Sequence, residues 1–238
     1  MKAARRARND RPLAVSAGPG AAGPASPPTA PPADPLSRLK TFWNARYAKA
    51  GEDFVYGTAP NAFLAASVGK ILPGGAVLCI ADGEGRNSVW LARQGFVVSA
   101  IDVADEGVAK ARTLAAREGV AVDATVADVT RFDYGSARYD AVVSIFLHLP
   151  AKARRATHRR IVEALKPGGV FIYEAYGPEQ LTYGTGGPAE QALLHSLDDV
   201  VADLEGCTIE HRFTGMRMVQ EGNAHHGEGH VVQVIARR

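Results

Sequence analysis

The residues with the clearest chemical meaning form a glycine-rich turn between an apolar run and a helical pattern. Residues 76–81 are apolar, and Asp82, Gly83 and Gly85 follow them directly. Residues 88–93 then have the apolar spacing of a helix. A strand, a glycine turn and a helix in this order present backbone N–H groups to a nucleotide-like ligand, and glycine leaves room for it. The turn therefore predicts a cofactor site.

A carboxylate at the end of the next apolar run strengthens this prediction. Residues 96–102 form a second strand-like segment, which ends in Asp102, 19 residues after Gly83. A carboxylate at about this distance, at the carboxyl end of the neighbouring strand, can accept hydrogen bonds from ribose hydroxyls. We therefore expect Asp102 and the glycine turn to face one ligand.

A histidine follows the most continuously apolar strand of the chain. Residues 141–146 have the composition of a central parallel strand buried on both faces, and His148 comes two residues later. The carboxyl ends of such strands are where open α/β sheets bind ligands. Two roles are open for His148. It lines the substrate pocket or accepts a proton from a nucleophile that needs to lose one, or it is a neutral histidine hydrogen-bonded to the backbone.

Composition and charge narrow the class of protein. The chain has 238 residues, a formal net charge of +2 and two cysteines. These values give no basis for nucleic-acid binding or a disulfide framework, and no apolar run approaches the roughly 18–20 residues that span a bilayer. The basic run at residues 154–160 lacks interleaved aromatic residues. We expect a cytoplasmic protein with a small-molecule partner and no nucleic-acid or membrane partner. The oligomeric state is not indicated.

The order of elements predicts one folded domain behind an N-terminal tail. Residues 1–35 are rich in Ala, Pro, Gly and Arg and are expected to be disordered, either as a chain extension or, less favoured, as a transit peptide. Residues 36–238 form the domain. Expected helices cover residues 36–47, 62–71, 88–93, 104–117, 152–166 and 191–204. Expected strands cover residues 76–81, 96–102, 122–127, 141–146, 170–176, 208–218 and 230–236.

The segment between the last two strands is rich in histidine and glutamate. Residues 221–230 hold three histidines and two glutamates, but their spacing matches no strong metal motif. His225 and His226 would also point to opposite sides of an extended chain. We therefore expect no metal site. We expect a long glycine-rich hairpin loop, from which Glu221 and His226 reach the ligand pocket.

Two motifs resemble those of a known enzyme family. Residues 83–88 with Leu91 and Ala92 are similar to the glycine motif of tellurite-resistance-type and thiopurine-type methyltransferases, a branch of the class I S-adenosylmethionine-dependent enzymes. The turn at residues 165–169 is similar to a specific signature of the same class. The resemblance covers residues 42–236. It implies a Rossmann-like, three-layer α/β sandwich with a mostly parallel seven-stranded sheet and a C-terminal antiparallel hairpin.

The resemblance also implies an activity and the residues for it. The cofactor is S-adenosylmethionine, and a methyl group passes to a small-molecule nucleophile such as an oxyanion or a thiol. Gly83 and Gly85 hold its amino-acid end, Asp102 its ribose, and Asp128 with Val129 its adenine. The alternative for Asp128 is a turn residue before Phe132. Further expected cofactor residues are Asp82, Asn87 and Phe146. Expected residues of the acceptor pocket are Tyr56, Asn61, His148 and Tyr176, with Trp43 and Tyr47 either as pocket walls or as part of a packed cap.

Two departures from the family pattern keep other functions open. Cys79 stands where the family has a carboxylate, and Ala81 stands where it has the first glycine. Alanine is expected there only if its φ is below zero, and Asp82 or Glu84 is expected to replace the carboxylate. These departures favour a catalytically degenerate module that binds S-adenosylmethionine or S-adenosylhomocysteine. A nicotinamide-dependent oxidoreductase is the third alternative, disfavoured by the turn at residues 165–169 and the terminal hairpin.

Overall fold

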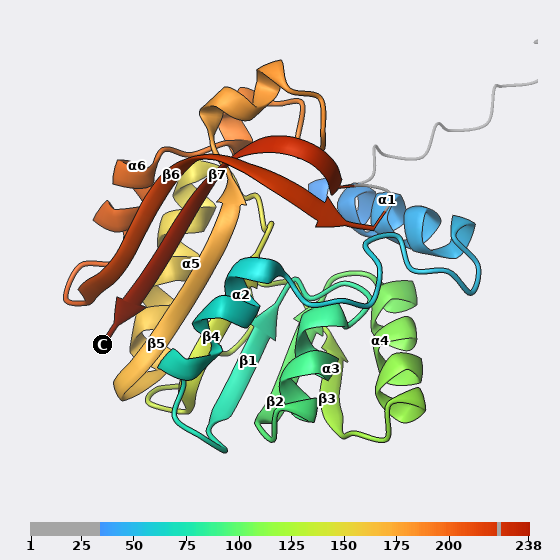
Figure 1. Cartoon of the computed structure of the whole chain (residues 1–238), viewed down its shortest axis with the longest axis horizontal. Helices are drawn as coiled ribbons and strands as arrows, with labels where there is room; N and C mark the ends of the chain where they lie inside the picture. Colours follow the sequence, from blue (N-terminus) through green and yellow to red (C-terminus); the bar gives the residue numbers. More distant parts are fainter. Residues whose placement is uncertain (1–33, 223–224) are drawn as a thin grey trace, which may run out of the picture. The chain divides into compact units, whose positions relative to one another are not determined.

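A computed structural model describes residues 34–222 and 225–238 (Figure 1). The predicted tail therefore lies outside the described residues, except for Asp34 and Pro35. Asp34 accepts hydrogen bonds from the backbone N–H groups of Leu36 and Ser37 and so begins the first helix. No helix in the described part of the chain is long and apolar enough to cross a membrane.

The centre of the domain is one seven-stranded sheet with the strand order β3-β2-β1-β4-β5-β7-β6. Strands β1 to β5 run parallel, and β7 pairs antiparallel with both β5 and β6. The predicted sheet, mostly parallel with a closing antiparallel hairpin, is confirmed. The strands are β1 (Ala76–Ile80), β2 (Val97–Asp102), β3 (Val122–Val126), β4 (Tyr139–Ile145), β5 (Leu165–Tyr176), β6 (Thr208–Glu221) and β7 (His225–Arg237).

Helices cover both faces of this sheet. The α-helices are α1 (Pro35–Lys49), α2 (Ala62–Ser67), α3 (Arg86–Arg93), α4 (Asp105–Arg117), α5 (Ala151–Ala164) and α6 (Leu197–Ala202). Three 3₁₀ turns are η1 (Val68–Lys70), η2 (Pro178–Thr182) and η3 (Gln191–Leu193).

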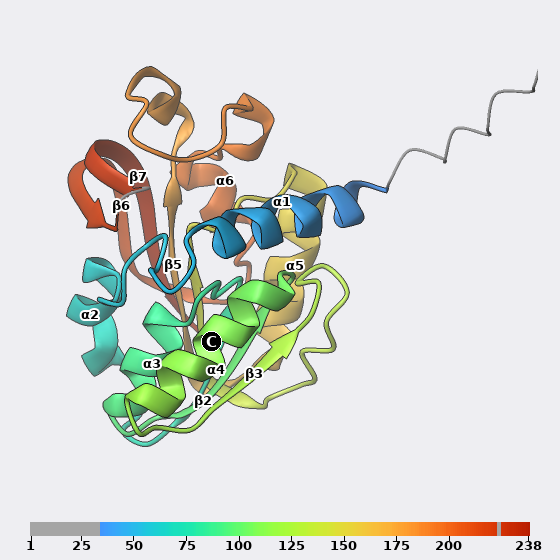
Figure 2. The same ribbon diagram turned by 90° about the vertical axis from the view of Figure 1, so that its right-hand side faces the viewer.

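The two faces form separate cores because side chains alternate along each strand. On β1, Leu78 and Ile80 join the core that contains α5 and α6, whereas Val77 and Cys79 join the core that contains α2, α3 and α4. Helix α1 lies next to α4, at the end of the sheet where the parallel strands finish (Figure 2). Helix α1 therefore covers the carboxyl ends of the parallel strands.

The predicted helix at residues 191–204 is wrong. The segment begins with the 3₁₀ turn η3, and α6 starts only after Ser196. Ser196 accepts a hydrogen bond from the Asp199 backbone, and the Asp199 carboxylate accepts one from the Ser196 backbone. This capping box starts a new helix, because it satisfies the free N–H groups of the first turn.

The predicted long hairpin loop is also wrong. Strands β6 and β7 stay paired as far as Glu221 and His225, so most of the predicted loop is sheet. Val219 and Glu221 are both buried, and they alternate along β6. An extended strand places both side chains on the same, inner face, which a loop would not do. The hairpin reaches past the rest of the sheet toward α1 (Figure 1).

The turn expected at residues 165–169 lies within β5. Strand β5 begins at Leu165, and its pairing with β4 shifts register between Tyr139 and Ala141. Gly168 has a φ of 81°, a value at which glycine is favoured. The reversal predicted from the sequence is therefore present as an irregular entry into the strand.

Candidate active site

The glycine turn joins β1 to α3 in a backbone conformation that its residues explain in part. Gly83 and Gly85 have φ values of 61° and 90°. A Cβ on Gly85 would lie 2.7 Å from the Ala111 Cα, so glycine there lets α3 approach α4. Ala81 has a φ of 50°, and the expectation of a φ below zero at this position is wrong. The turn therefore holds the alanine in a left-handed conformation.

Asp102 lies against the glycine turn, as its position at the end of β2 predicts. Its Oδ2 accepts a hydrogen bond of 2.9 Å from the Gly83 N–H, and its Oδ1 accepts one of 2.8 Å from the Ala104 N–H. Burial raises the pKa of Asp102, and these backbone bonds oppose the rise. A carboxylate oxygen has two lone pairs, so both atoms keep the capacity to accept from a ligand hydroxyl.

Asp82 and Glu84 differ in the hydrogen bonds that their carboxylates accept within the protein. Glu84 accepts hydrogen bonds of 2.8 Å from both Lys110 Nζ and the Val55 N–H. Asp82 accepts from the Ser88 hydroxyl with Oδ2, whereas its Oδ1 is buried and has no partner within residues 34–222 and 225–238. Burial raises the pKa of Asp82 to about 7, against the Ser88 bond, which lowers it. Asp82 is therefore the one of the two with an oxygen left for a ligand.

Aromatic residues of α1 and the following loop cover the glycine turn. The Tyr47 ring stacks on Trp43 with centroids 5.6 Å apart, and the Tyr56 ring lies 6.4 Å from Trp43. Tyr47 is buried, and its hydroxyl occupies the space that a Cβ on Gly83 would need. Tyr47 thus fills the role of a packed cap, and Trp43 and Tyr56 continue the same cover.

Arg46 is a residue of this cover that the sequence reasoning missed. Its guanidinium lies 5.8 Å from the Trp43 ring centroid and 5.7 Å from that of Tyr56. Its Nε is buried and lacks a hydrogen-bond partner in the described part of the chain. The signal that could have found it is helical spacing, because residues 43, 46 and 47 share one face of α1.

A buried polar network lies beside the turn and links four distant parts of the chain. Arg86 Nη2 pairs with Glu221 at 2.5 Å, and Arg217 Nη2 pairs with Glu221 at 2.7 Å and with Glu174 at 2.5 Å. The Asn61 amide donates to both glutamates, at 2.8 Å and 2.7 Å. The two arginines balance the two glutamates. Of these residues, sequence reasoning had selected only Asn61 and Glu221.

Asn61 and Asn87 have structural partners of their own. Asn61 Oδ1 accepts from the Leu64 N–H and caps α2, as the sequence predicts, although α2 ends at Ser67 and passes into η1. Asn87 Oδ1 accepts from the Asn61 N–H at 2.9 Å, so the oxygen of this predicted cofactor residue is engaged within the protein.

At the end of β4, three predicted residues come together. Tyr176 lies 4.6 Å from Phe146 and 6.1 Å from His148, measured between ring centroids, and the His148 ring is within 8° of parallel to that of Tyr176. His148 Nδ1 lies 3.2 Å from the Leu193 carbonyl oxygen. Burial lowers the pKa of His148 to about 4, although the Leu193 bond opposes this. The ring is therefore neutral at pH 7.

The predicted adenine residues lie after β3. Both oxygens of Asp128 accept from the Thr130 hydroxyl, and Oδ1 also accepts from the Thr130 N–H at 2.8 Å. Val129 is buried, and its carbonyl accepts from the Tyr134 hydroxyl. Asp128 thus shapes its own turn. His226, expected to reach the pocket, is exposed on β7.

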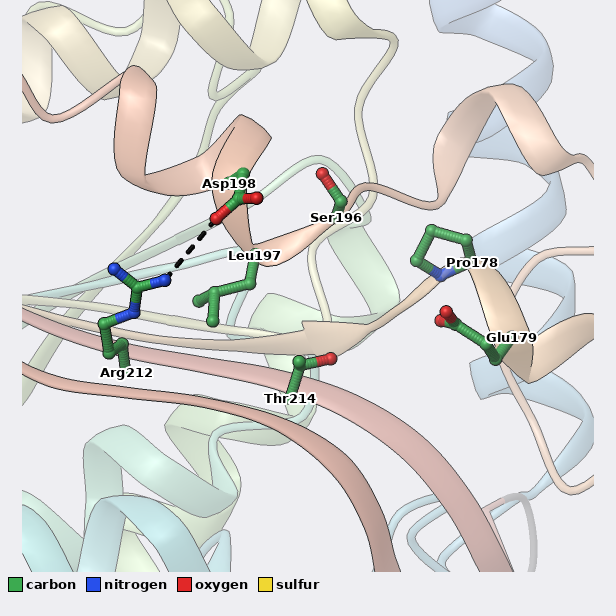
Figure 3. A pocket seen from close by; sticks show the side chains of 7 residues that line it. All are labelled: Pro178, Glu179, Ser196, Leu197, Asp198, Arg212 and Thr214. Carbon is green, nitrogen blue, oxygen red and sulfur yellow. Dashed lines mark ion pairs between the residues drawn. The ribbon is translucent and has the colours of Figure 1, made fainter.

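A hollow of about 300 Å³, separate from the glycine turn, lies beyond the end of β5 (Figure 3). An ion pair between Arg212 and Asp198, at 3.5 Å, lies at one side of it. None of the predicted cofactor residues lines this hollow. Its lining residues are Pro178, Glu179, Ser196, Leu197, Asp198, Arg212 and Thr214.

The unpaired atoms of the glycine turn and its cover fit the amino-acid end of S-adenosylmethionine. That end carries an ammonium group and a carboxylate. Asp82 Oδ1 is a buried acceptor without a donor, and Arg46 Nε is a buried donor without an acceptor, among the described residues. Because an unpaired buried polar atom costs about 1–3 kcal/mol, a zwitterion that satisfied both atoms would be favoured.

Comparisons with known proteins agree with this geometry. A family model described as a methyltransferase domain matches residues 77–169. The ubiquinone biosynthesis O-methyltransferase of Paramagnetospirillum magneticum is 39% identical over 98 residues, which are 40% of this chain and 38% of that protein. A putative methyltransferase of Geobacillus is 25% identical over 149 residues, 58% of each chain. The chain thus spans about two fifths to three fifths of these relatives.

Solved structures share the fold. The magnesium protoporphyrin IX methyltransferase of Synechocystis with bound S-adenosylhomocysteine superposes with a TM-score of 0.63 at 19% identity, over 86% of this chain and all (100%) of that one. TehB of Haemophilus influenzae has a TM-score of 0.63 at 17% identity, over 82% and 67% of the two chains. Because the structural neighbours are of several kinds, they do not single out the tellurite-resistance-type branch. Residues 77–169 thus match a methyltransferase domain, and they lie in a sheet that shares its fold with S-adenosylmethionine-dependent methyltransferases.

Proposed function

We propose that the protein transfers a methyl group from S-adenosylmethionine to a small-molecule nucleophile in the cytoplasm, with no nucleic-acid partner. The observation that carries the proposal is the hydrogen bond between Asp102 and the Gly83 N–H. It brings the carboxyl ends of β1 and β2 together, so that the glycine turn and a carboxylate lie side by side at the edge of the sheet where open α/β sheets bind a nucleoside.

The residues around the glycine turn bind and orient the cofactor. Gly83 and Gly85 receive the amino-acid end, where Asp82 accepts from its ammonium and Arg46 donates to its carboxylate. Asp102 accepts from the ribose hydroxyls. The proposed adenine residues are Asp128 and Val129, with Phe146 along the cofactor and Asn87 supporting the site through Asn61.

When bound, the cofactor supplies an electrophilic methyl group on a sulfonium. The acceptor pocket is formed by Tyr56, His148 and Tyr176. The aromatic cover from α1 excludes water, and the strand ends align the acceptor with the methyl group. Alignment and dehydration account for most of the rate in such a reaction, so no covalent nucleophile is required of the protein.

The direct test is isothermal titration calorimetry with S-adenosylmethionine. Asp102→Asn should weaken binding roughly 10- to 100-fold, because it replaces a charged acceptor by a neutral one. Asp198→Asn is the matched control, since that carboxylate is 90% exposed and should leave affinity unchanged. An absence of binding to the wild-type protein, or full affinity in Asp102→Asn, would defeat the proposal.

A second candidate is a binding module without catalysis. It is favoured by Cys79, which replaces a carboxylate and is buried with a thiol pKa raised well above its usual value by burial. Ala81 in a left-handed conformation favours it too. Release of S-adenosylhomocysteine with any acceptor in a panel of thiols, phenols, selenite and tellurite would remove this candidate.

A further inference from the structure

The acceptor side of the site contains a buried lone pair on His148. Nδ1 lies 3.2 Å from the Leu193 carbonyl oxygen, and a carbonyl oxygen can only accept, so Nδ1 carries the proton. Nε2 of the neutral ring is then an acceptor. Nε2 is buried and meets no hydrogen-bond partner in the part of the chain that the structure describes.

The ring that carries this lone pair is held by its hydrogen bond to Leu193 and by its packing against Tyr176. Its plane is parallel to Tyr176 within 8°, and Tyr176 in turn lies 4.6 Å from Phe146. Phe146 has a φ of 55°, an uncommon conformation for a bulky residue. Strained residues cluster where a site over-determines its geometry. The direction of the Nε2 lone pair is therefore set by the fold.

Charges around this end of the sheet do not favour an anionic acceptor. Arg86 and Arg217 are the cations of the buried network, and Glu174 and Glu221 neutralise both. The imidazole itself is neutral, because burial and the nearby His195 both disfavour its charged form. Arg46, beside Tyr56, is a further cation, and in the proposed complex it pairs with the cofactor carboxylate. An oxyanion would therefore meet a lone pair and a network without net positive charge.

We propose that the methyl acceptor is a neutral, protic nucleophile, a hydroxyl or a thiol on a small molecule, whose hydrogen is donated to His148 Nε2. This inference rests on the proposed methyl transfer and narrows its acceptor class. It makes His148 the residue that selects a protic group and excludes oxyanions such as selenite and tellurite.

The reaction balances with His148 as the proton acceptor. The oxygen or sulfur of the acceptor forms a bond to the methyl carbon while the carbon–sulfonium bond breaks and its electron pair stays on sulfur. The attacking atom becomes cationic, and its proton becomes far more acidic. A weakly basic imidazole is therefore sufficient to take that proton at Nε2. The imidazolium returns it to solvent when the product leaves.

Nitrogen-15 NMR of the wild-type protein bound to S-adenosylhomocysteine tests the contact without turnover. Catechol and thiophenol should shift the His148 Nε2 resonance and leave Nδ1 in place, whereas selenite should shift neither. If neither protic probe moves the Nε2 resonance, the proposal is wrong. This experiment needs no variant, so it holds even if a substitution at residue 148 unfolds the protein.

Turnover by variants tests the role in the reaction. His148→Phe keeps a ring for Tyr176 but has no lone pair, and it should lower turnover with catechol or thiophenol at least 100-fold. His148→Gln, whose amide oxygen can accept, should restore part of that loss. His211→Phe is the control, because His211 lies on β6 with its ring 5.2 Å from that of Phe63.

The outcomes separate this inference from the proposed function. Affinity for S-adenosylmethionine should stay within twofold in His148→Phe. Methylation of selenite or tellurite at the rate of the protic acceptors, or full turnover in His148→Phe, would overturn the inference and leave the methyltransferase proposal intact. Failure of the wild-type protein to bind S-adenosylmethionine would instead defeat the proposed function.

Discussion

At the scale of single residues, the two unusual features of this glycine turn are the backbone conformation of Ala81 and the buried carboxyl of Asp82. Ala81 stands where the resembled family has a glycine, Asp82 follows it, and both are in states that cost free energy. Ala81 holds a φ of 50°, and Asp82 has a buried oxygen without a partner among the described residues. Each cost can be measured by one substitution.

Ala81→Gly should stabilise the protein by roughly 0.5–1 kcal/mol. A left-handed conformation costs an L-residue about 1–2 kcal/mol, and the extra freedom of glycine in the unfolded chain offsets part of that gain. Ala156→Gly is the control, because Ala156 is exposed within α5 and glycine there should cost about 1 kcal/mol. Urea unfolding gives both values, and a loss of stability in Ala81→Gly would contradict a strained alanine in this turn.

Asp82 should make the stability of the ligand-free protein fall as pH rises from about 4 to about 7. The pKa of its carboxyl rises from 3.8 in the unfolded chain to about 7 in the folded protein, so the folded state binds a proton that the unfolded state has lost. The stabilisation from this group is complete below pH 3.8 and is lost as pH rises through 7. In Asp82→Asn this contribution should vanish, which urea unfolding at several pH values measures as a flatter profile. Parallel profiles for the two proteins would show that Asp82 titrates normally.

At the scale of elements, Glu221 connects β6 to α2 and α3. Its carboxylate pairs with Arg86 and Arg217 and accepts from Asn61. Although burial raises the pKa of Glu221, the two guanidinium groups hold it below its usual value. The carboxylate is therefore charged at neutral pH, and its ion pairs join β6 to the rest of the domain.

Glu221→Gln should destabilise the protein by about 3–5 kcal/mol, because it leaves two buried arginines short of one negative charge. Glu210→Gln is the control. Glu210 also pairs with an arginine of the hairpin region, but its partner Arg237 is 32% exposed, and such a pair contributes at most about 1 kcal/mol. Unfolding by guanidinium chloride compares them, and equal losses in the two variants would mean that the Glu221 network is no stronger than a surface pair.

The sequence predicted this sheet well and its polar network poorly, for a physical reason. Hydrophobic periodicity reports which residues face a core, so β1, β2 and β4 were recognised from their apolar runs. The network is made by residues far apart in sequence, such as Glu174 and Arg217, and no local pattern marks their partners. Asn61 was recognised because its capping role is local.

The same distinction explains the errors in the C-terminal part. Residues 191–204 have helical spacing throughout, and the break appears only through the capping box at Ser196. Residues 221–230 are polar and rich in glycine, which is typical of a loop. They continue the hairpin because each strand supplies the other with backbone hydrogen bonds, and that pairing is not visible in composition.

At the scale of the whole domain, the hairpin near the C-terminal end of the chain touches a loop near the N-terminal end, beside the glycine turn. Gly222, at the tip of the β6–β7 hairpin, lies against the loop that carries Tyr56. A Cβ on Gly222 would be 2.5 Å from the Val55 carbonyl oxygen and 2.6 Å from the Tyr56 Cα. The Val55 N–H is also held by Glu84 of the glycine turn. The hairpin tip therefore supports the cover of the turn from outside.

Gly222→Ala should loosen this cover. The new methyl group cannot fit against the Val55–Tyr56 backbone, so the hairpin tip and the loop must separate. Gly206→Ala isolates that contact, since Gly206 has a φ of 87° against 64° for Gly222 but has open space around it. Both variants should lose a similar amount of stability from backbone strain, roughly 1 kcal/mol.

Only Gly222→Ala should speed hydrogen exchange at residues 54–57, where the Gly57 N–H bonds the Phe54 carbonyl. It should also weaken S-adenosylmethionine binding, because part of the binding free energy is then spent on ordering the cover. If exchange at residues 54–57 were equal in the two variants, the hairpin tip would not support the loop. The cover would then depend on α1 alone, through the stacking of Tyr47 on Trp43.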